Sequence, residues 1–294
     1  MIVIIKYLNK PVVLITGASS GLGFAMALRF AAEGYRVIAG IRQITTHSEL
    51  VERAEQQGIS EFINCQQVDV TDEAQVDRLV KWVEEHYGQL DVLVNNAGIA
   101  VGGMVEEVPI EALRDQLEIN FFAVVRLTQK VLPLMRKQQS GTIMNISSIS
   151  GCIGFPGYAP YCASKFALEG FSEALRLELL PFGIRVVLIE PGAYKTSIWQ
   201  KGFAGMHTRP SSPYQSLLEA VLQYSCQAAE TAPEPDEVAR KAVQIAALSS
   251  PKLRYPIGNG VLASLIGKAV LPWRWYERIV LKMLNNGNRV QRTD

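Results

Sequence analysis

The stretch Val12-Val-Leu-Ile-Thr-Gly-Ala-Ser-Ser-Gly-Leu-Gly23 decides the fold class of this 294-residue chain. Its first part, Val12–Thr16, is apolar and β-branched and predicts a buried strand, and a helical pattern begins near Leu22. Between them, glycines at 17, 21 and 23 let the backbone turn tightly and approach a pyrophosphate, while the helix start offers free N–H groups. The stretch therefore predicts a strand–turn–helix unit that binds a dinucleotide.

The same alternation of strand and helix continues along the chain. The predicted strands are Val12–Thr16, Arg36–Gly40, Phe62–Val68, Val92–Asn95, Gly141–Ser147 and Arg185–Glu190. The predicted helices are Leu22–Glu33, Ser48–Gln57, Asp72–Tyr87, Ile110–Gln139 and Ala159–Leu180. Such alternation predicts an α/β protein with a single doubly wound parallel sheet, the Rossmann fold, and helices on both faces.

The pattern changes after Pro191. Lys201–Pro213 is rich in Gly, Ser and Pro and predicts a loop, followed by helices over Tyr214–Ala229 and Asp236–Leu248 and a last short strand over Leu253–Gly258. We expect one domain over residues 1–294, in which 193–230 form a substrate loop or lid and 260–294 a helical C-terminal extension. For the basic and apolar stretch from Trp273 to Leu284, packing against the core is favoured, and a membrane surface or a cover over the substrate site are the alternatives.

Composition excludes several classes of protein. Apolar residues make up 48% and charged residues 19% of the chain, which excludes a disordered or fibrous protein, and a net charge of +1 argues against a nucleic-acid partner. The four cysteines have neither metal-site nor disulfide-framework spacing, so we expect no metal and a reducing compartment. No apolar run is long enough for a transmembrane span, which predicts a cytoplasmic protein.

The Gly-rich turn also contains a rival motif. Gly17-Ala-Ser-Ser-Gly21 fits the G-x-S-x-G nucleophile elbow of α/β-hydrolases. Such an elbow needs earlier strands to build the oxyanion hole, whereas this one follows the first strand, and the chain has only three histidines. The dinucleotide interpretation is therefore preferred.

Residues that follow the next strands predict which dinucleotide binds. Ile41-Arg42 follows the second strand, where an acidic residue would favour NAD, and a guanidinium there suits the 2′-phosphate of NADP. A solvated loop arginine is the alternative. Asp69, after the third strand, has the chemistry to accept from the adenine amino group, or it is a simple turn residue. Asn95-Asn-Ala-Gly98, after the fourth strand, suits close packing against the cofactor or is a turn-forming cluster.

The fifth strand leads to the candidate catalytic residues. Ser148 follows it, Tyr161 comes thirteen residues later, and Lys165 lies four residues beyond on the same face of a helix. A tyrosine phenol has a pKa near 10, and we expect the Lys165 ammonium to lower it. Tyr161 then delivers a proton to a carbonyl oxygen that Ser148 also binds, while hydride arrives from a nicotinamide.

In these motifs the chain resembles the classical short-chain dehydrogenase/reductase family over about Val12 to Trp199. The matching motifs are Thr16-Gly-Ala-Ser-Ser-Gly-Leu-Gly23, Asn95-Asn-Ala-Gly98, Asn120, Asn145-Ile-Ser-Ser148, Tyr161-Cys-Ala-Ser-Lys165 and Pro191-Gly192. Within the family, Tyr161–Gly170 and Pro191–Thr196 are similar to the hydroxysteroid and retinol dehydrogenases.

The resemblance assigns roles to individual residues. It makes Tyr161 the acid/base and Ser148 the residue that orients the carbonyl; Lys165 binds the nicotinamide ribose, and Asn120 holds a water in a proton relay. It gives Ser19, Ser20 and Arg42 to the 2′-phosphate and Thr196 to the nicotinamide carboxamide. The remaining residues expected to bind the cofactor, besides Tyr161 and Lys165, are Thr16, Gly17, Gly21, Leu22, Gly23, Asp69, Val70, Asn96, Ala97, Gly98, Pro191 and Gly192.

Together these observations predict an oxidoreductase that interconverts a carbonyl and an alcohol with NADP(H), or with NAD(H) as the second choice. Aromatic residues predict a lipophilic small-molecule substrate, contacted by Ser148, Tyr161, Phe155, Tyr194 and Trp199. The resemblance implies a homodimer or homotetramer built on the long helices Ile110–Gln139 and Ala159–Leu180. The alternative function is a nucleotide-sensing protein that binds NADP without turnover.

Overall fold

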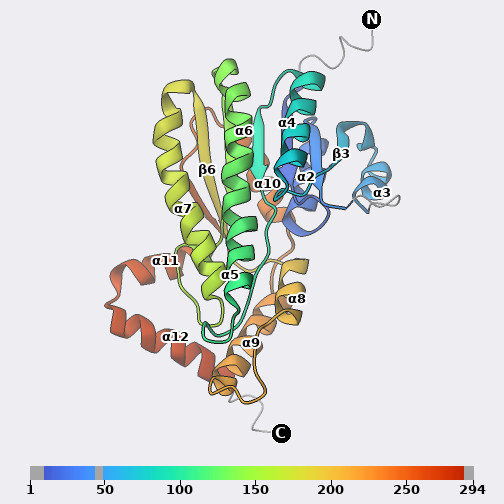
Figure 1. Ribbon diagram of the computed structural model, residues 1–294. Helices are drawn as coiled ribbons and strands as arrows, with labels where there is room; N and C mark the ends of the chain where they lie inside the picture. Colours follow the sequence, from blue (N-terminus) through green and yellow to red (C-terminus); the bar gives the residue numbers. More distant parts are fainter. Residues whose placement is uncertain (1–9, 44–48, 288–294) are drawn as a thin grey trace, which may run out of the picture.

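The computed structural model describes residues 10–43 and 49–287 and contains one seven-stranded parallel sheet in the order β3-β2-β1-β4-β5-β6-β7 (Figure 1). The prediction of a doubly wound parallel sheet is confirmed, and the start of the predicted helix at Ser48 lies outside the described residues. The strands are β1 Val12–Thr16, β2 Arg36–Ile41, β3 Ile63–Gln67, β4 Val92–Asn95, β5 Gly141–Ile146, β6 Ile184–Pro191 and β7 Arg254–Ile257.

The strand order reverses beside β1, which places the ligand site. β1 pairs with β2 on one side and with β4 on the other, so the chain winds outward in both directions from this strand. In open parallel sheets the crevice beyond the carboxyl ends of the strands at such a switch point is where ligands bind. The Gly-rich turn after β1 opens into this crevice.

One face of the sheet is covered by α2 (Gly21–Ala32) and α10 (Asp236–Ala246). Met26, Ala27 and Phe30 of α2 and Val238 of α10 are fully buried in one apolar cluster with β1, β2, β4 and β6. This packing fixes the N-terminal end of α2 at the carboxyl edge of β1. The shorter α3 (Glu49–Gln56) and the 3₁₀ turn η1 (Ser60–Phe62) lead from β2 to β3.

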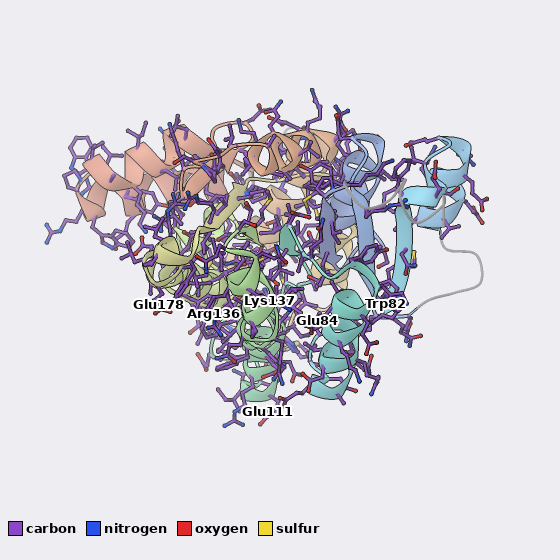
Figure 2. All side chains as sticks on the ribbon, turned by 90° about the horizontal axis from the view of Figure 1, so that it is seen from above. Trp82, Glu84, Glu111, Arg136, Lys137 and Glu178 are labelled. Carbon is purple, nitrogen blue, oxygen red and sulfur yellow. The ribbon has the colours of Figure 1, made fainter. Side chains whose placement is uncertain are left out.

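The opposite face is covered by α4 (Glu73–Tyr87), α6 (Ala123–Gln138) and α7 (Ala159–Leu179), which lie side by side on the near side of the sheet in Figure 1. Asp72 caps α4 by accepting from the Gln75 amide, and Gly88 ends it in a left-handed conformation (φ 66°). Charged side chains such as Glu84, Arg136 and Glu178 are exposed on these helices (Figure 2).

The long helix predicted over Ile110–Gln139 is interrupted. The structure has α5 (Ile110–Leu117), a π-helical turn η2 (Glu118–Phe122) and then α6. Single π turns inside helices insert one residue and are common at functional sites. Asn120 lies in this turn, so the interruption sets the direction of its side chain.

The region after β6 is more helical than predicted. After the 3₁₀ turns η3 (Ile149–Gly151) and η4 (Leu180–Phe182), the elements are α8 (Ser197–Ala204), α9 (Gln215–Glu230), α10, β7, α11 (Val261–Val270) and α12 (Trp273–Gly287). The loop prediction for Lys201–Pro213 is wrong over residues 201–204, which belong to α8. Gly202 lies close to the Ala100 carbonyl, so this glycine allows close packing of the helix and does not end it. No helix among the described residues has the length and apolar character needed to cross a membrane.

Candidate active site

A cleft of about 490 Å³ lies at the carboxyl ends of β1, β4, β5 and β6. It brings together most of the residues that the sequence selects: Gly17, Ser19, Ser20, Gly21, Leu22, Arg42, Asp69, Val70, Asn96, Ala97, Gly98, Ser148, Tyr161, Lys165, Pro191, Gly192, Tyr194 and Thr196. A second, larger recess of about 1000 Å³ lies between α2, α9 and α10 and contains none of the candidate catalytic residues.

The Gly-rich turn is shaped by close backbone approach. Gly17 and Gly21 have φ values of 66° and 57°, which side chains rarely adopt. A Cβ at Gly23 would lie 2.3 Å from the Gly17 carbonyl oxygen and 2.4 Å from Nδ2 of Asn96. Thr16, at the end of β1, accepts from the amides of Asn96 (3.0 Å) and Ala97 (3.1 Å). Thr16 and Gly23 therefore shape the turn and do not line the cleft.

The start of α2 has the chemistry of an anion site. Ser20 is the N-cap residue, yet its side chain makes no capping hydrogen bond, and the first turn holds no acidic residue. The helix dipole and the free amides at this end favour negative charge. Exposed Ser19, Ser20 and Arg42 lie around the same part of the cleft. These donors fit the phosphate groups of a dinucleotide.

The Asp69 carboxylate is already engaged in local structure. Its Oδ1 accepts from the Thr71 amide (2.9 Å) and from the Thr71 hydroxyl (2.7 Å). This is the turn role that the sequence left open beside a contact with adenine. Since Asp69 also lines the cleft, the second carboxylate oxygen stays available to a ligand.

Tyr161 and Lys165 lie one helical turn apart near the start of α7. The Lys165 Nζ donates to the Ile146 carbonyl at the end of β5 (2.8 Å) and lies 5.7 Å from the centre of the Tyr161 ring. Burial lowers the Lys165 pKa to about 8, against the opposing effect of Glu169. The ammonium is thus held between the end of the sheet and the phenol, in position to bind hydroxyl groups.

Burial decides the protonation of Tyr161. It raises the pKa of the phenol to about 12, and hydrogen bonding with Ser148 lowers it only in part. Ser148 is itself held by donating to the Pro191 carbonyl (3.5 Å) and accepting from the Ser150 amide (3.1 Å). The predicted lowering of this pKa by Lys165 is not met, because burial dominates and Lys165 is not among the groups that shift the phenol. Tyr161 is a neutral phenol, which is the form that donates a proton.

Asn120 is buried behind the cleft instead of lining it. Its Oδ1 accepts from the Ile99 amide (2.9 Å), and its Nδ2 donates to the Ile99 carbonyl (3.0 Å) and to the Ser164 hydroxyl (3.1 Å). Gln116 binds the same loop through Val101 and Ile99. Both amides therefore hold the loop after β4, and Asn120 also links it to α7. A role for Asn120 in a water relay stays a prediction.

The structure places the substrate residues predicted from the sequence in different surroundings. Phe155 lies against Tyr224 of α9, with ring centres 5.5 Å apart, in an apolar cluster that also contains Tyr161. Tyr194 touches the cleft, but its side chain is 2% exposed in the core and its hydroxyl donates to Glu237 (2.8 Å). Its hydroxyl is thus bound to α10, and a contact between Tyr194 and the substrate stays a prediction. The side chain of Trp199 lies outside the described residues.

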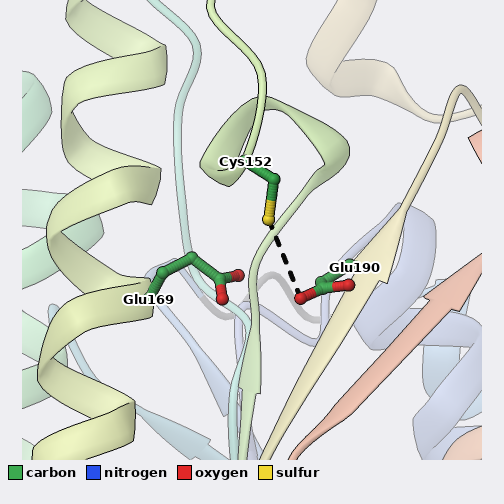
Figure 3. Close-up of side chains that lie close together, drawn as sticks. All are labelled: Cys152, Glu169 and Glu190. Carbon is green, nitrogen blue, oxygen red and sulfur yellow. Dashed lines mark hydrogen bonds between the residues drawn. The ribbon is translucent and has the colours of Figure 1, made fainter. Parts of the chain in front are cut away.

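A buried acidic pair behind the cleft escaped sequence reasoning. Glu169 of α7 and Glu190 of β6 come within 4.8 Å of each other and of the Cys152 thiol (Figure 3). Burial, and then repulsion by Glu169, raises the pKa of Glu190 to about 7, although Arg254 opposes the shift. Arg254 of β7 supplies positive charge to both carboxylates, at 3.0 Å and 3.1 Å, so the guanidinium compensates the charge of this buried cluster. The signal in the sequence for this pair was Glu190, an acidic residue that follows an apolar run near the end of a strand.

Comparisons with known proteins agree with this geometry. Residues 11–206 match the family model of the short chain dehydrogenases. The chain is 44% identical over 280 residues to the uncharacterized oxidoreductase YusZ of Bacillus subtilis, covering 94% of this chain and 99% of that protein. It is 35% identical to mouse 17-beta-hydroxysteroid dehydrogenase type 1 over 255 residues, covering 84% of this chain and 74% of that protein.

A comparison with solved structures agrees with the sequence matches. A crystal structure of a single-residue variant of the actinorhodin polyketide ketoreductase with NADPH superimposes with a TM-score of 0.74 at 30% identity, covering 86% of this chain and 98% of the other. A match over two thirds of the sequence, together with the parallel sheet and the cleft, agrees with the resemblance seen in the motifs. The chain therefore belongs to the short-chain dehydrogenase/reductase family and is an oxidoreductase that acts on CH–OH groups.

Proposed function

We propose that this enzyme interconverts a carbonyl and an alcohol on a lipophilic substrate with NADP(H) as its cofactor. The observation that carries the proposal is the arrangement of Ser148, Tyr161 and Lys165 in one cleft with a Gly-rich phosphate turn. The proposal takes the chain as one catalytic unit, with 193–230 next to the substrate and 260–294 as an extension.

Each of the three residues has a separate task in reduction. A bound nicotinamide supplies the hydride. Tyr161, a neutral phenol, donates its proton to the carbonyl oxygen, and the Ser148 hydroxyl donates a hydrogen bond to the same oxygen. The Lys165 ammonium, held on the Ile146 carbonyl, stabilises the phenolate that proton transfer leaves on Tyr161. In the oxidising direction the same phenolate takes the proton back.

The preference for NADP(H) rests on Arg42. Its guanidinium is exposed at the cleft, next to Ser19 and Ser20, at a position where an acidic residue would repel a 2′-phosphate. The ketoreductase with a related structure was solved with NADPH, which supports the same choice. NAD(H) is the alternative cofactor.

A lipophilic substrate is supported by the surroundings of the Tyr161 phenol. Phe155, Tyr158 and Tyr224 pack together in the apolar cluster that includes Tyr161. The name of the mouse hydroxysteroid dehydrogenase points to the same class of molecule. Apolar surroundings next to Tyr161 favour an apolar substrate, because burial of its surface there is favourable.

The test is NADPH oxidation against a panel of steroids, retinoids, long-chain ketones and small hydrophilic ketones. We expect turnover of the apolar members, and loss of at least about 100-fold in kcat for Tyr161→Phe with unchanged NADPH binding. Turnover of hydrophilic ketones alone would contradict the substrate class. NADPH binding without any turnover would favour the nucleotide-sensing alternative.

A further inference from the structure

The last two helices form an arm that stands away from the body of the protein (Figure 1). This C-terminal arm consists of α11 and α12, with side chains described for residues 261–284. It contains half of the large apolar side chains that are exposed in the described parts of the chain: Leu262, Ile266, Val270, Trp273, Trp275, Ile279, Leu281 and Met283. Their exposed fractions reach 70%, and clustered apolar exposure of this kind marks an interaction surface.

The helix α11 has an outer surface without charge. Leu262, Ile266 and Val270 recur every four residues and are exposed, so they form one apolar stripe. The single charged residue of this helix, Lys268, points inward, where it donates to the Cys152 carbonyl and lies 5.1 Å from the Phe166 ring centre. A ten-residue helix with no exposed charge is poorly suited to water on its outer side.

The helix α12 combines three stripes, each repeating every four residues. Tyr276, Val280 and Leu284 face the body, and the last two pack in the apolar cluster that contains Tyr161. The core-packing interpretation therefore holds for this stripe alone. A second stripe is exposed and apolar and consists of Trp275, Ile279 and Met283. A third stripe is exposed and cationic and consists of Arg274, Arg278 and Lys282.

Charge distinguishes between the occupants that such a surface could have. The exposed side of the arm carries three cations and one carboxylate, Glu277, while the chain as a whole has a net charge of only +1. A second copy of the arm would bring like-charged stripes together, which is unfavourable. An anionic bilayer complements the cationic stripe, and tryptophan with aliphatic side chains inserts at the boundary between headgroups and acyl chains.

We propose that the C-terminal arm docks this enzyme on the surface of an anionic lipid bilayer. The apolar stripes of α11 and α12 enter the interfacial layer, and Arg274, Arg278 and Lys282 bind lipid phosphates beside them. The inward stripe of α12 keeps the arm attached next to the catalytic tyrosine. Docking requires no turnover, so it stands or falls independently of the proposed reaction.

The test is co-sedimentation of the full chain with vesicles. We expect binding to phosphatidylcholine vesicles that contain about one-third phosphatidylserine and little binding to phosphatidylcholine alone. Two variants, W275Q/I279Q and R274Q/R278Q/K282Q, should each bind at least about tenfold more weakly. The matched control V105Q/L248Q changes exposed apolar residues outside the arm and should bind like the wild type.

A second measurement guards against misfolded variants. In the wild-type protein, brominated lipids should quench tryptophan fluorescence, and the quenching should be lost in W273F/W275F. The proposal is overturned if the wild type ignores anionic vesicles or if W275Q/I279Q sediments as well as the wild type. It is equally overturned if W275Q/I279Q halves the molecular mass in lipid-free solution, because the surface would then be covered by a second copy.

Discussion

The Nε atom of Arg254 lies 3.1 Å from a carboxylate oxygen of Glu190, so a residue of the last strand neutralises a buried acid of the strand beside it. The same Nε lies 3.0 Å from Glu169 of α7, and the terminal NH2 group lies 2.6 Å from Glu173. Glu190 is 1% exposed and directly precedes Pro191 of the cleft. Arg254 thus holds together the helix that carries Tyr161 and the strand that ends at the cleft.

Replacing Arg254 by Met should destabilise the protein because two buried carboxylates lose their counter-charge. The guanidinium is 36% exposed, so we expect about 2 kcal/mol at pH 8, less than the cost of breaking a fully buried pair. Urea unfolding measures the loss, and Arg240→Met, which removes an exposed pair with Asp236, should cost under about 0.5 kcal/mol. Equal stability of the two variants would contradict the assignment.

Glu190 should make the protein less stable as the pH rises. Its pKa is raised from an ordinary value of 4.5 to about 7, so the folded protein binds this proton more tightly than the unfolded chain. The resulting loss of stability begins near pH 4.5, is complete above about pH 7, and amounts to at most about 3 kcal/mol.

The variant Glu190→Gln removes this titration. Between pH 5 and pH 8 it should lose less unfolding free energy than the wild type, as followed by urea denaturation at each pH. The control Glu173→Gln alters an exposed carboxylate on the same arginine and should keep the wild-type pH dependence. If E190Q and the wild type change in parallel, another group is responsible.

Arg42→Ala should weaken NADPH binding and leave NADH binding nearly unchanged, since the lost charge–charge contact exists only with the 2′-phosphate. We expect about a tenfold or greater rise in the Kd for NADPH, measured by fluorescence titration. Arg29→Ala, on α2 away from the phosphate turn, is the control. A matching loss of affinity for both dinucleotides would assign Arg42 to general folding of the site.

Gly23→Ala should abolish cofactor binding and lower stability. The added Cβ would meet the Gly17 carbonyl oxygen at 2.3 Å, and the neighbour is backbone that cannot move aside. Gly170→Ala in α7 has open space around the new methyl and should raise stability by about 0.5–1 kcal/mol through helix propensity. Thermal unfolding with and without NADPH separates the two effects, and a Gly23→Ala enzyme that binds normally would refute the close approach.

Local patterns in the sequence were sufficient for much of the fold. The apolar runs and the Gly-rich turn predicted the strands and the site at their carboxyl ends, because these signals lie within a few residues of one another. The helix predicted over Asp72–Tyr87 likewise matches α4, which Asp72 caps and Gly88 ends. The π-helical turn at Asn120 was missed, since one inserted residue hardly alters a helical pattern.

What the sequence did not reveal depends on distant neighbours. Glu169, Glu190 and Arg254 meet only because β6 pairs with β7 in one register, with Glu190 opposite Pro256. The pKa of Tyr161 could not be foreseen either, because it depends on how much water the surrounding chain removes. The burial of Tyr194 also follows from packing, through its hydrogen bond with Glu237 of α10.

The position of Arg254 has a consequence for biosynthesis. Synthesis proceeds from the N-terminus, so a nascent chain that already contains β1 to β6 and Tyr161 still lacks this guanidinium. Until residue 254 is added, Glu169 and Glu190 have no arginine between them and favour water over burial. We therefore expect the acid pair to be buried late, after the other six strands and α7 have been synthesised.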